Sequence, residues 1–242
     1  MKNNKPTIII GVSAGIAAYK IIELIHRLNK YDISVIMTDH AKSMIPPSEF
    51  KKIPGVSVFS ELFPKGFNYQ KILKKRQVDH ITLADQAVLV VIAPATANII
   101  AKIAHGLADD LLTTTILATK APVLICPSMN LHMWQNETVQ ENLGKIMKKG
   151  YYILPPDCGN LACGYKGVGR LADGNNIIRE INHIIFVKNS LTGKKIMITA
   201  GGTSESIDSV RVITNRGSGK MGKALALECA KRGAEVVLIR SK

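Results

Sequence analysis

The 242-residue sequence has few of the features that mark several other protein classes. Its four cysteines are too few for a disulfide-built scaffold of this length, so we expect free thiols. Cys158 and Cys163 are too far apart for a CxxC pair, and we expect no metal site. The longest apolar runs, such as 87–93, are far shorter than the roughly 20 residues of a membrane-spanning helix.

The chain also has few acidic and few aromatic residues, at a net charge of +14 with 5% aromatics. Its lysines and arginines are spread along the chain and do not alternate with aromatics, and no DNA-binding motif is evident. A basic solvated surface is therefore favoured over nucleic-acid binding, although non-specific polyanion binding at low salt stays open. Residues 1–5 are polar and resemble no signal peptide. We expect a soluble cytoplasmic protein with no membrane partner.

Apolar, β-rich segments alternate with amphipathic helical segments along the first three quarters of the chain. The predicted strands are 7–11, 34–37, 87–93, 123–126 and 151–154. The predicted helices are 16–28, 98–104, 111–118 and 139–149. This alternation predicts a doubly wound parallel α/β sheet, flavodoxin-like or Rossmann-like, with helices on both faces.

A second unit is predicted after a polar, turn-forming segment. It has a strand at 195–200, a glycine-rich loop, a helix at about 219–232 and a strand at 234–239. We predict one domain over 1–187, a linker over 188–193 and an incomplete α/β unit over 194–242. Two strands and a helix are too few to form an independent core of normal size.

Ligands of doubly wound sheets bind at the carboxyl ends of the strands. The segment Gly11–Gly15, which includes Ser13, joins the first strand to the first helix and suits a phosphate group. Thr38, at the end of the second strand, is placed to join this site. The segment is no GxGxxG fingerprint, so NAD is not indicated, and a simple tight turn remains the alternative.

Two further motifs follow later strands. In Pro94–Asn98, small residues allow a flat ring to approach, and Thr96 and Asn98 offer hydrogen bonds; helix capping is the alternative. In Pro127–Trp134, the Asn130 amide is able to donate a hydrogen bond to a carboxylate. Because the amide is neutral, it adds no positive charge that would oppose loss of CO2. The alternative for Asn130 is a capping or turn role, and the alternative for Trp134 is packing in the core.

His80 and Cys163 are candidate proton-transfer residues. An imidazole with an ordinary pKa near 6.5 serves as acid or base around neutrality. Cys163 lies in the glycine-rich segment 157–164, and a thiol with an ordinary pKa of about 8.5 is protonated at neutral pH and able to donate. A structural histidine and a small buried cysteine are the alternatives.

Together, Asp79–Leu83, Pro94–Asn98, Pro127–Trp134 and Ala162–Gly164 resemble the flavin-containing cysteine decarboxylases, in particular the phosphopantothenoylcysteine decarboxylases of coenzyme A synthesis. The resemblance implies bound FMN and a site formed between subunits of a trimer-based homo-oligomer, with a dodecamer as one form. It implies catalytic roles for His80, Asn130 and Cys163, and substrate contacts by Asn130 and Met133. The implied cofactor-binding residues are Ser13, Thr38, Ala95, Thr96, Asn98 and Ser128.

The implied reaction converts the small phosphorylated substrate 4'-phospho-N-pantothenoylcysteine into 4'-phosphopantetheine. The amidated cysteine has no electron sink, so the flavin must first oxidise its side chain to a thioaldehyde before CO2 leaves. A thiol then protonates carbon and the reduced flavin returns hydride. A regulatory flavoprotein without decarboxylase activity and a flavin prenyltransferase are the alternatives.

Residues 194–242 resemble the beginning of phosphopantothenate–cysteine ligase. The matching positions are Thr199–Glu205, Ile207–Asp208, Val210–Arg211, Asn215 and Gly219–Gly222. Ser206 and Ser209 depart from the usual prolines there, and Gly217 from the usual serine. We expect no ligase activity from this incomplete unit alone.

Overall fold

The computed structural model describes residues 5–62, 79–162, 164 and 166–240. Contacts divide the chain into two compact units, Met1–Ile181 and Asn182–Lys242, and each is described by itself. None of the described helices is both long and apolar enough to cross a membrane.

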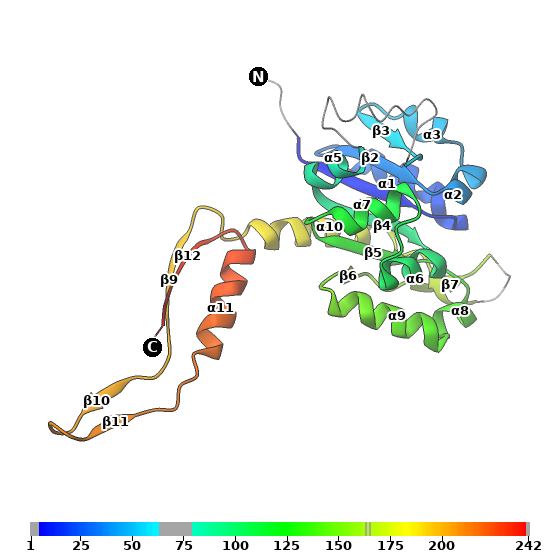
Figure 1. The fold of residues 1–242 in the computed structure, drawn as a ribbon. Helices are drawn as coiled ribbons and strands as arrows, with labels where there is room; N and C mark the ends of the chain where they lie inside the picture. Colours follow the sequence, from blue (N-terminus) through cyan, green and yellow to red (C-terminus); the bar gives the residue numbers. More distant parts are fainter. Residues whose placement is uncertain (1–4, 63–78, 163, 165, 241–242) are drawn as a thin grey trace. The chain divides into compact units, whose positions relative to one another are not determined.

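The first unit is built on a six-stranded sheet in the order β3-β2-β1-β4-β5-β6, with every neighbouring pair parallel (Figure 1). Its strands are β1 (Thr7–Val12), β2 (Asp32–Met37), β3 (Val56–Phe59), β4 (Ala87–Ala95), β5 (Val123–Pro127) and β6 (Tyr152–Ile153). The predicted doubly wound α/β fold is confirmed. Because β1 lies beside β4, the topology reverses between these two strands, as in the Rossmann order.

Helices connect the strands. They are the 3-10 helix η1 (Ile16–Tyr19), α1 (Lys20–Arg27), α2 (Asp39–Met44), α3 (Pro47–Lys51), α5 (Asp79–Gln86), α6 (Ala97–His105), α7 (Leu111–Ala118), α8 (Leu131–Gln135), α9 (Glu137–Lys148) and α10 (Gly174–Asn189). The predicted helix 16–28 is therefore a 3-10 turn that continues as an α-helix. An antiparallel hairpin of β7 (Asp157–Asn160) and β8 (Lys166–Arg170), which was not predicted, precedes α10.

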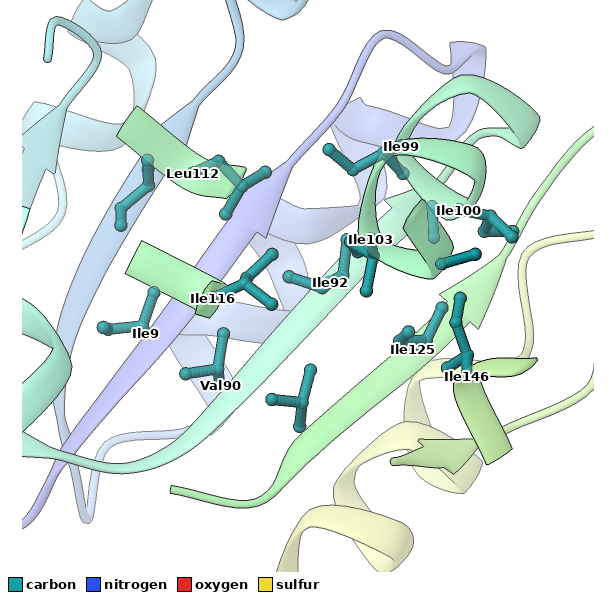
Figure 2. Close-up of a cluster of buried hydrophobic side chains, with 14 of the residues drawn as sticks. Ile9, Val90, Ile92, Ile99, Ile100, Ile103, Leu112, Ile116, Ile125 and Ile146 are labelled. Atoms are coloured by element: carbon teal, nitrogen blue, oxygen red, sulfur yellow. The ribbon is translucent and has the colours of Figure 1, made fainter. Parts of the chain in front are cut away.

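The core lies on both faces of this sheet. On one face, Ile9, Val90, Ile92 and Ile125 of the strands pack against isoleucines and leucines of α6, α7 and α9 (Figure 2). Side chains alternate between the faces of a strand. The intervening strand residues Ile8, Ile10, Leu89 and Val91 are also fully buried, so the opposite face is covered too. Each such side chain contributes about 1.5–3 kcal/mol on burial.

Cys126, the neighbour of Ile125 in β5, shows what covers the opposite face. Burial, and secondarily the nearby carboxylate of Glu180 in α10, raises the pKa of this thiol well above its usual range. Cys126 is therefore a buried, unreactive core residue, and Glu180 of α10 lies close enough to influence its charge.

The second unit contains the parallel strands β9 (Lys195–Ala200) and β12 (Glu235–Arg240), with α11 (Lys220–Lys231) packed against them. A short hairpin joins β10 (Ser204–Ser206) to β11 (Val212–Thr214). Ile198, Ala226 and Cys229 are the buried residues of a small apolar cluster. The helix α10 continues to Asn189, into the predicted linker 188–193. The predicted domain limits themselves stay predictions.

Candidate active site

A cavity of about 690 Å³ lies beside the ends of β1, β4 and β5, a volume typical of small-molecule sites. It is therefore at the switch point of the sheet, where ligands of this architecture bind. Its walls come from the loop after β1, the loops after β4 and β5, and the β7–β8 hairpin. Its lining residues include Ala14, Gly15, Lys20, Thr96, Ser128, Met129, Asn130, Met133, Asn160, Leu161, Ala162 and Arg170.

Ser13 joins the loop after β1 to the loop after β4. Its hydroxyl, in a side chain only 2% exposed, donates to the Pro94 carbonyl at 2.7 Å and accepts from the Thr96 amide at 3.1 Å. Ser13 is not among the residues that line the cavity. The hydroxyl expected to contact a cofactor is thus engaged with the protein and fixes the two loops that do line the cavity.

Gly15 explains how closely these loops approach each other. A Cβ atom built on Gly15 would lie 3.0 Å from Cγ of Pro94, so a side chain here would push the loops apart. Ala14 and Gly15 therefore present mainly backbone to the cavity. Such a wall suits a flat or phosphorylated ligand that must come close to the main chain.

Thr96 lines the cavity and also caps α6, because its hydroxyl accepts from the Ile99 amide at 3.5 Å. The other predicted residues of this group lie outside the cavity lining. Ala95 is fully buried in β4 and Asn98 is exposed in α6. The Thr38 hydroxyl caps α2 by accepting from the Ala41 amide at 3.3 Å.

Asn130 combines the two roles that the sequence left open. Its Oδ1 accepts from the His132 amide at 2.8 Å and caps α8, while the residue also lines the cavity. Because Oδ1 is the acceptor in the cap, the donor group of this side chain is the Nδ2 amide. Ser128, also in the lining, is fixed by its amide, which donates to the Ala95 carbonyl at 2.9 Å.

Met133 and Trp134 differ, although they are neighbours. Met133 is 47% exposed and lines the cavity, so it is not a core residue. Trp134 is partly buried and packs against the apolar core, as the core-packing alternative predicted.

The β7–β8 hairpin closes one side of the cavity and is bound to the loop that carries Asn130. The Met129 amide donates to the Gly169 carbonyl at 2.9 Å. Gly169 has a φ of +151°, and a Cβ there would lie 2.1 Å from the Met129 carbonyl oxygen, so only glycine fits. The hairpin thereby brings Asn160, Leu161 and Ala162 to the cavity wall. Cys163, which follows Ala162, lies outside the described residues.

His80 lies half-buried at the second position of α5. It is not part of the cavity lining in the same chain. Its role in a site shared between chains, which the resemblance implies, stays a prediction.

Sequence reasoning did not single out Lys20 and Arg170, two cationic residues of the cavity lining. Lys20 begins α1, directly after the loop and 3-10 turn that follow β1, and Arg170 ends β8. The available signal for Lys20 was its position after the Gly11–Gly15 loop, and the signal for Arg170 was the Gly-Val-Gly-Arg segment that it ends. The spacing of these motifs does not indicate that the two residues share one cavity.

The site has the features that a flavin requires. The cavity combines a backbone wall at Ala14 and Gly15 with the hydroxyls of Thr96 and Ser128. Apolar side chains of Met129, Met133 and Leu161 offer surface for a planar ring. Main-chain amides, hydroxyls and the cationic Lys20 are groups that bind a phosphate.

Family models match both parts of the chain. Residues 1–186 match the model described as flavoprotein, and residues 191–242 match the C-terminal domain of DNA/pantothenate metabolism flavoproteins. The coenzyme A biosynthesis bifunctional protein CoaBC of Bacillus subtilis is 42% identical over 99% of this chain, and that of Escherichia coli is 43% identical over 96%. The chain spans 58% and 56% of the length of these relatives.

Solved structures share the fold of the first unit. A PPC decarboxylase variant in complex with pantothenoylaminoethenethiol is 27% identical, with a TM-score of 0.65 over 74% of this chain and 97% of that one. The FMN-binding protein AtHal3 is 28% identical, with a TM-score of 0.63 over 74% and 96%. The FMN-dependent cysteine decarboxylase SpaF is 28% identical, with a TM-score of 0.62 over 76% and 97%.

Proposed function

This chain belongs to the flavoprotein family, and from that premise we propose that it is an FMN-dependent decarboxylase of 4'-phospho-N-pantothenoylcysteine. The product is 4'-phosphopantetheine, an intermediate of coenzyme A synthesis. The observation that carries the proposal is the cavity at the β1–β4 switch point, where Thr96, Ser128 and Asn130 meet the β7–β8 hairpin. The similarity to the coenzyme A biosynthesis proteins CoaBC and to the decarboxylase structures supports the same reaction.

The cofactor and the substrate occupy this cavity together in our proposal. Ala14, Gly15, Thr96 and Ser128 hold the FMN. FMN bound there would supply the reversible redox chemistry that the substrate's cysteine side chain requires. The protein's own residues orient the substrate, stabilise its charge and transfer protons.

Asn130 is the proposed contact for the substrate carboxylate. Its cap on α8 through Oδ1 orients the side chain, and the Nδ2 amide donates to the carboxylate. A neutral donor binds the carboxylate without the strong ion pair that would oppose loss of CO2. Met133 then packs against the substrate on the same side of the cavity.

His80 and Cys163 are the proposed proton-transfer groups. We assign His80 to the cavity of a neighbouring chain in a trimer-based homo-oligomer, which is consistent with its place outside the cavity lining of its own chain. Cys163 protonates the substrate carbon that loses CO2, and its neighbours Leu161 and Ala162 line the cavity. A cytoplasmic location is part of this proposal, and the exposed free thiol of Cys158 is in keeping with a reducing compartment.

The first test is the absorbance spectrum of the purified protein, together with mass-spectrometric detection of 4'-phosphopantetheine formed from 4'-phospho-N-pantothenoylcysteine. We expect a bound flavin and this product. A flavin without product would favour a regulatory flavoprotein. A colourless protein that takes up no added FMN would overturn the proposal.

A further inference from the structure

The β7–β8 hairpin forms one wall of the cavity, but its own ladder is weak. Its strands are four and five residues long, and three of these nine residues are glycines, which offer no side chain to pack. The register shifts between Asp157 and Cys158, so the pairing is irregular at the base of the hairpin, where β7 begins and β8 ends. Because a two-stranded hairpin is marginally stable at best by itself, this wall depends on contacts with its surroundings.

Two hydrogen bonds provide such contacts. The Gly169 carbonyl accepts the bond from the Met129 amide described above. At the base of the hairpin, the Asp157 carboxylate accepts from the Asp173 amide, with 2.8 Å between Oδ2 and the nitrogen. Asp157 is the first residue of β7, and Asp173 comes three residues after Arg170 at the end of β8. This bond therefore joins the start of β7 to the segment after β8, where the ladder is irregular.

The Asp173 end of this bond is itself held in place. The Asp173 carboxylate accepts from the amide and from the side-chain nitrogen of Asn175, at 2.8 and 2.9 Å, which fixes the turn before α10. Arg27 of α1 donates to the Asn175 side-chain carbonyl at 2.5 Å. A series of hydrogen bonds thus runs from α1 through Asn175 and Asp173 to Asp157. The base of the hairpin is thereby fixed to α1, whose inner face is buried.

We propose that Asp157 is a positioning residue, which fixes the hairpin wall formed by Asn160, Leu161 and Ala162. Asp157 itself lies outside the lining of this cavity and acts through the hairpin. The inference rests on the proposed function, because Cys163, the proposed proton donor, directly follows Ala162 in the sequence. Proton delivery to the substrate requires a wall that keeps its place, since a displacement of about 1 Å can slow a reaction about a hundredfold.

Three variants test this role, each prepared as the full chain with FMN bound. Asp157→Ala removes the acceptor, whereas Asp157→Asn removes the charge but keeps an oxygen that is able to accept from the Asp173 amide. Asp208→Ala is the matched control. The Asp208 carboxylate also accepts from main-chain amides, those of Val210 and Arg211, but it does so in the β10–β11 hairpin and outside the cavity lining.

The first measurement is hydrogen exchange of the hairpin amides, followed by mass spectrometry, which does not depend on turnover. We expect peptides from 157–170 to exchange about tenfold faster in Asp157→Ala than in the parent, as loss of a hydrogen bond to a charged group predicts. Asp157→Asn should keep most of the protection, and Asp208→Ala should leave these peptides unchanged. Equal exchange in Asp157→Ala and the parent would overturn the inference.

The second measurement is the product mixture formed in aerated buffer, where dioxygen accepts the two electrons that a released enethiol leaves behind. In Asp157→Ala the ratio of enethiol to 4'-phosphopantetheine should rise about tenfold at equal FMN content, and Asp157→Asn should stay near the parent. A merely structural role would lower the urea midpoint and leave this ratio alone. Faster exchange with an unchanged ratio and an unchanged kcat/KM would therefore overturn the positioning role.

The two measurements also separate this inference from the proposed function. A parent protein that forms neither product would contradict the decarboxylation, and faster hairpin exchange in Asp157→Ala alone would still support the fixing of the wall by Asp157. A parent that forms 4'-phosphopantetheine, with Asp157→Ala matching Asp208→Ala in both measurements, would overturn the role of Asp157 and leave the decarboxylation in place.

Discussion

Ser13 and Thr96, which follow different strands, are joined by a buried hydrogen bond of 3.1 Å from the Thr96 amide to the Ser13 hydroxyl. The same hydroxyl donates to the Pro94 carbonyl at 2.7 Å. Both of these partners are backbone groups, and a longer contact of 3.4 Å joins the Ser13 hydroxyl to the Thr96 hydroxyl, so a change at Ser13 removes the whole link. It fixes the loops after β1 and β4, which form two walls of the candidate site.

Ser13→Ala should therefore destabilise the first unit. The Thr96 amide and the Pro94 carbonyl would lose this partner in a buried site, at a cost of about 1–3 kcal/mol in the free energy of unfolding. Urea denaturation followed by circular dichroism measures this loss, and a lower FMN affinity should accompany it. Ser57→Ala, at an exposed position of β3, should stay within about 0.5 kcal/mol of the parent. Equal stability of the two variants would show that the Ser13 link contributes nothing.

The carboxylate of Asp173 predicts a pH dependence of stability. Hydrogen bonds from the Asn175 amide and side chain lower the pKa of Asp173 from its ordinary value. Because the folded pKa lies below the unfolded one, this stabilisation is present above the unfolded value of about 3.9 and disappears as pH falls through the folded pKa. Asp173→Ala should accordingly lower the urea midpoint at pH 7, and the difference from the parent should shrink in strong acid.

Asp85→Ala, which removes an exposed carboxylate from α5, is the control for this pH series. If the difference in urea midpoint between Asp173→Ala and the parent stays constant across the acid range, the charge of Asp173 does not contribute to stability.

The sheet was predictable from sequence because its strands are short apolar runs, and such runs indicate strands buried inside a parallel sheet. Segments 7–11, 87–93 and 123–126 are buried on both faces except at Thr7 and Val88, which are partly exposed, and continuous apolar sequence is what such burial requires. The β7–β8 hairpin was not predicted, because its glycines serve a close approach to Met129 and leave no alternating pattern.

The site was predictable only in part, for a similar reason. Motifs after strands identified Thr96, Ser128 and Asn130, since the carboxyl ends of parallel strands meet at one edge. The engagement of Ser13 with Pro94 and Thr96, and the meeting of Lys20 with Arg170, depend on contacts between distant parts of the chain. No local pattern contains that information.

Cys163→Ser should separate loss of CO2 from the final reduction. A serine hydroxyl is a far weaker acid than a thiol, so protonation of the substrate carbon should fail and an oxidised enethiol should accumulate. Mass spectrometry distinguishes this compound from 4'-phosphopantetheine, because it is lighter by two hydrogens. Cys158→Ser should still give the saturated product, and the opposite pattern in the two variants would assign the proton donor to Cys158.

His80 should act in a site shared between chains. Chains carrying His80→Asn and chains carrying Asn130→Asp are each expected to be inactive, but assemblies mixed in equal amounts should regain activity. If one chain supplies Asn130 and its neighbour His80, random mixing leaves one half times one half, or about a quarter, of the sites intact. Without regain after denaturation and joint refolding, His80 would belong to the site of its own chain or have no catalytic role.

Asn130→Asp is the sharpest test of the proposed carboxylate contact, because the substitution preserves the structural role of the side chain. Aspartate caps helices as well as asparagine does, so the cap on α8 through the His132 amide should persist. The new charge, however, would face the substrate carboxylate in a partly closed cavity. Repulsion at about 4 Å there amounts to several kcal/mol, which predicts a hundredfold or larger loss of kcat/KM.

The chain provides a matched control for this variant. Asn136 caps α9 in the same manner, with its Oδ1 accepting from the Thr138 amide at 3.0 Å, and it is not part of the cavity lining. Asn136→Asp should therefore keep near-parental turnover, which separates the capping role from the carboxylate contact. If Asn130→Asp retains both FMN and near-normal kcat/KM, then Asn130 does not contact the carboxylate. If both variants lose activity together, the loss comes from the helix caps and not from charge at the reacting end of the substrate.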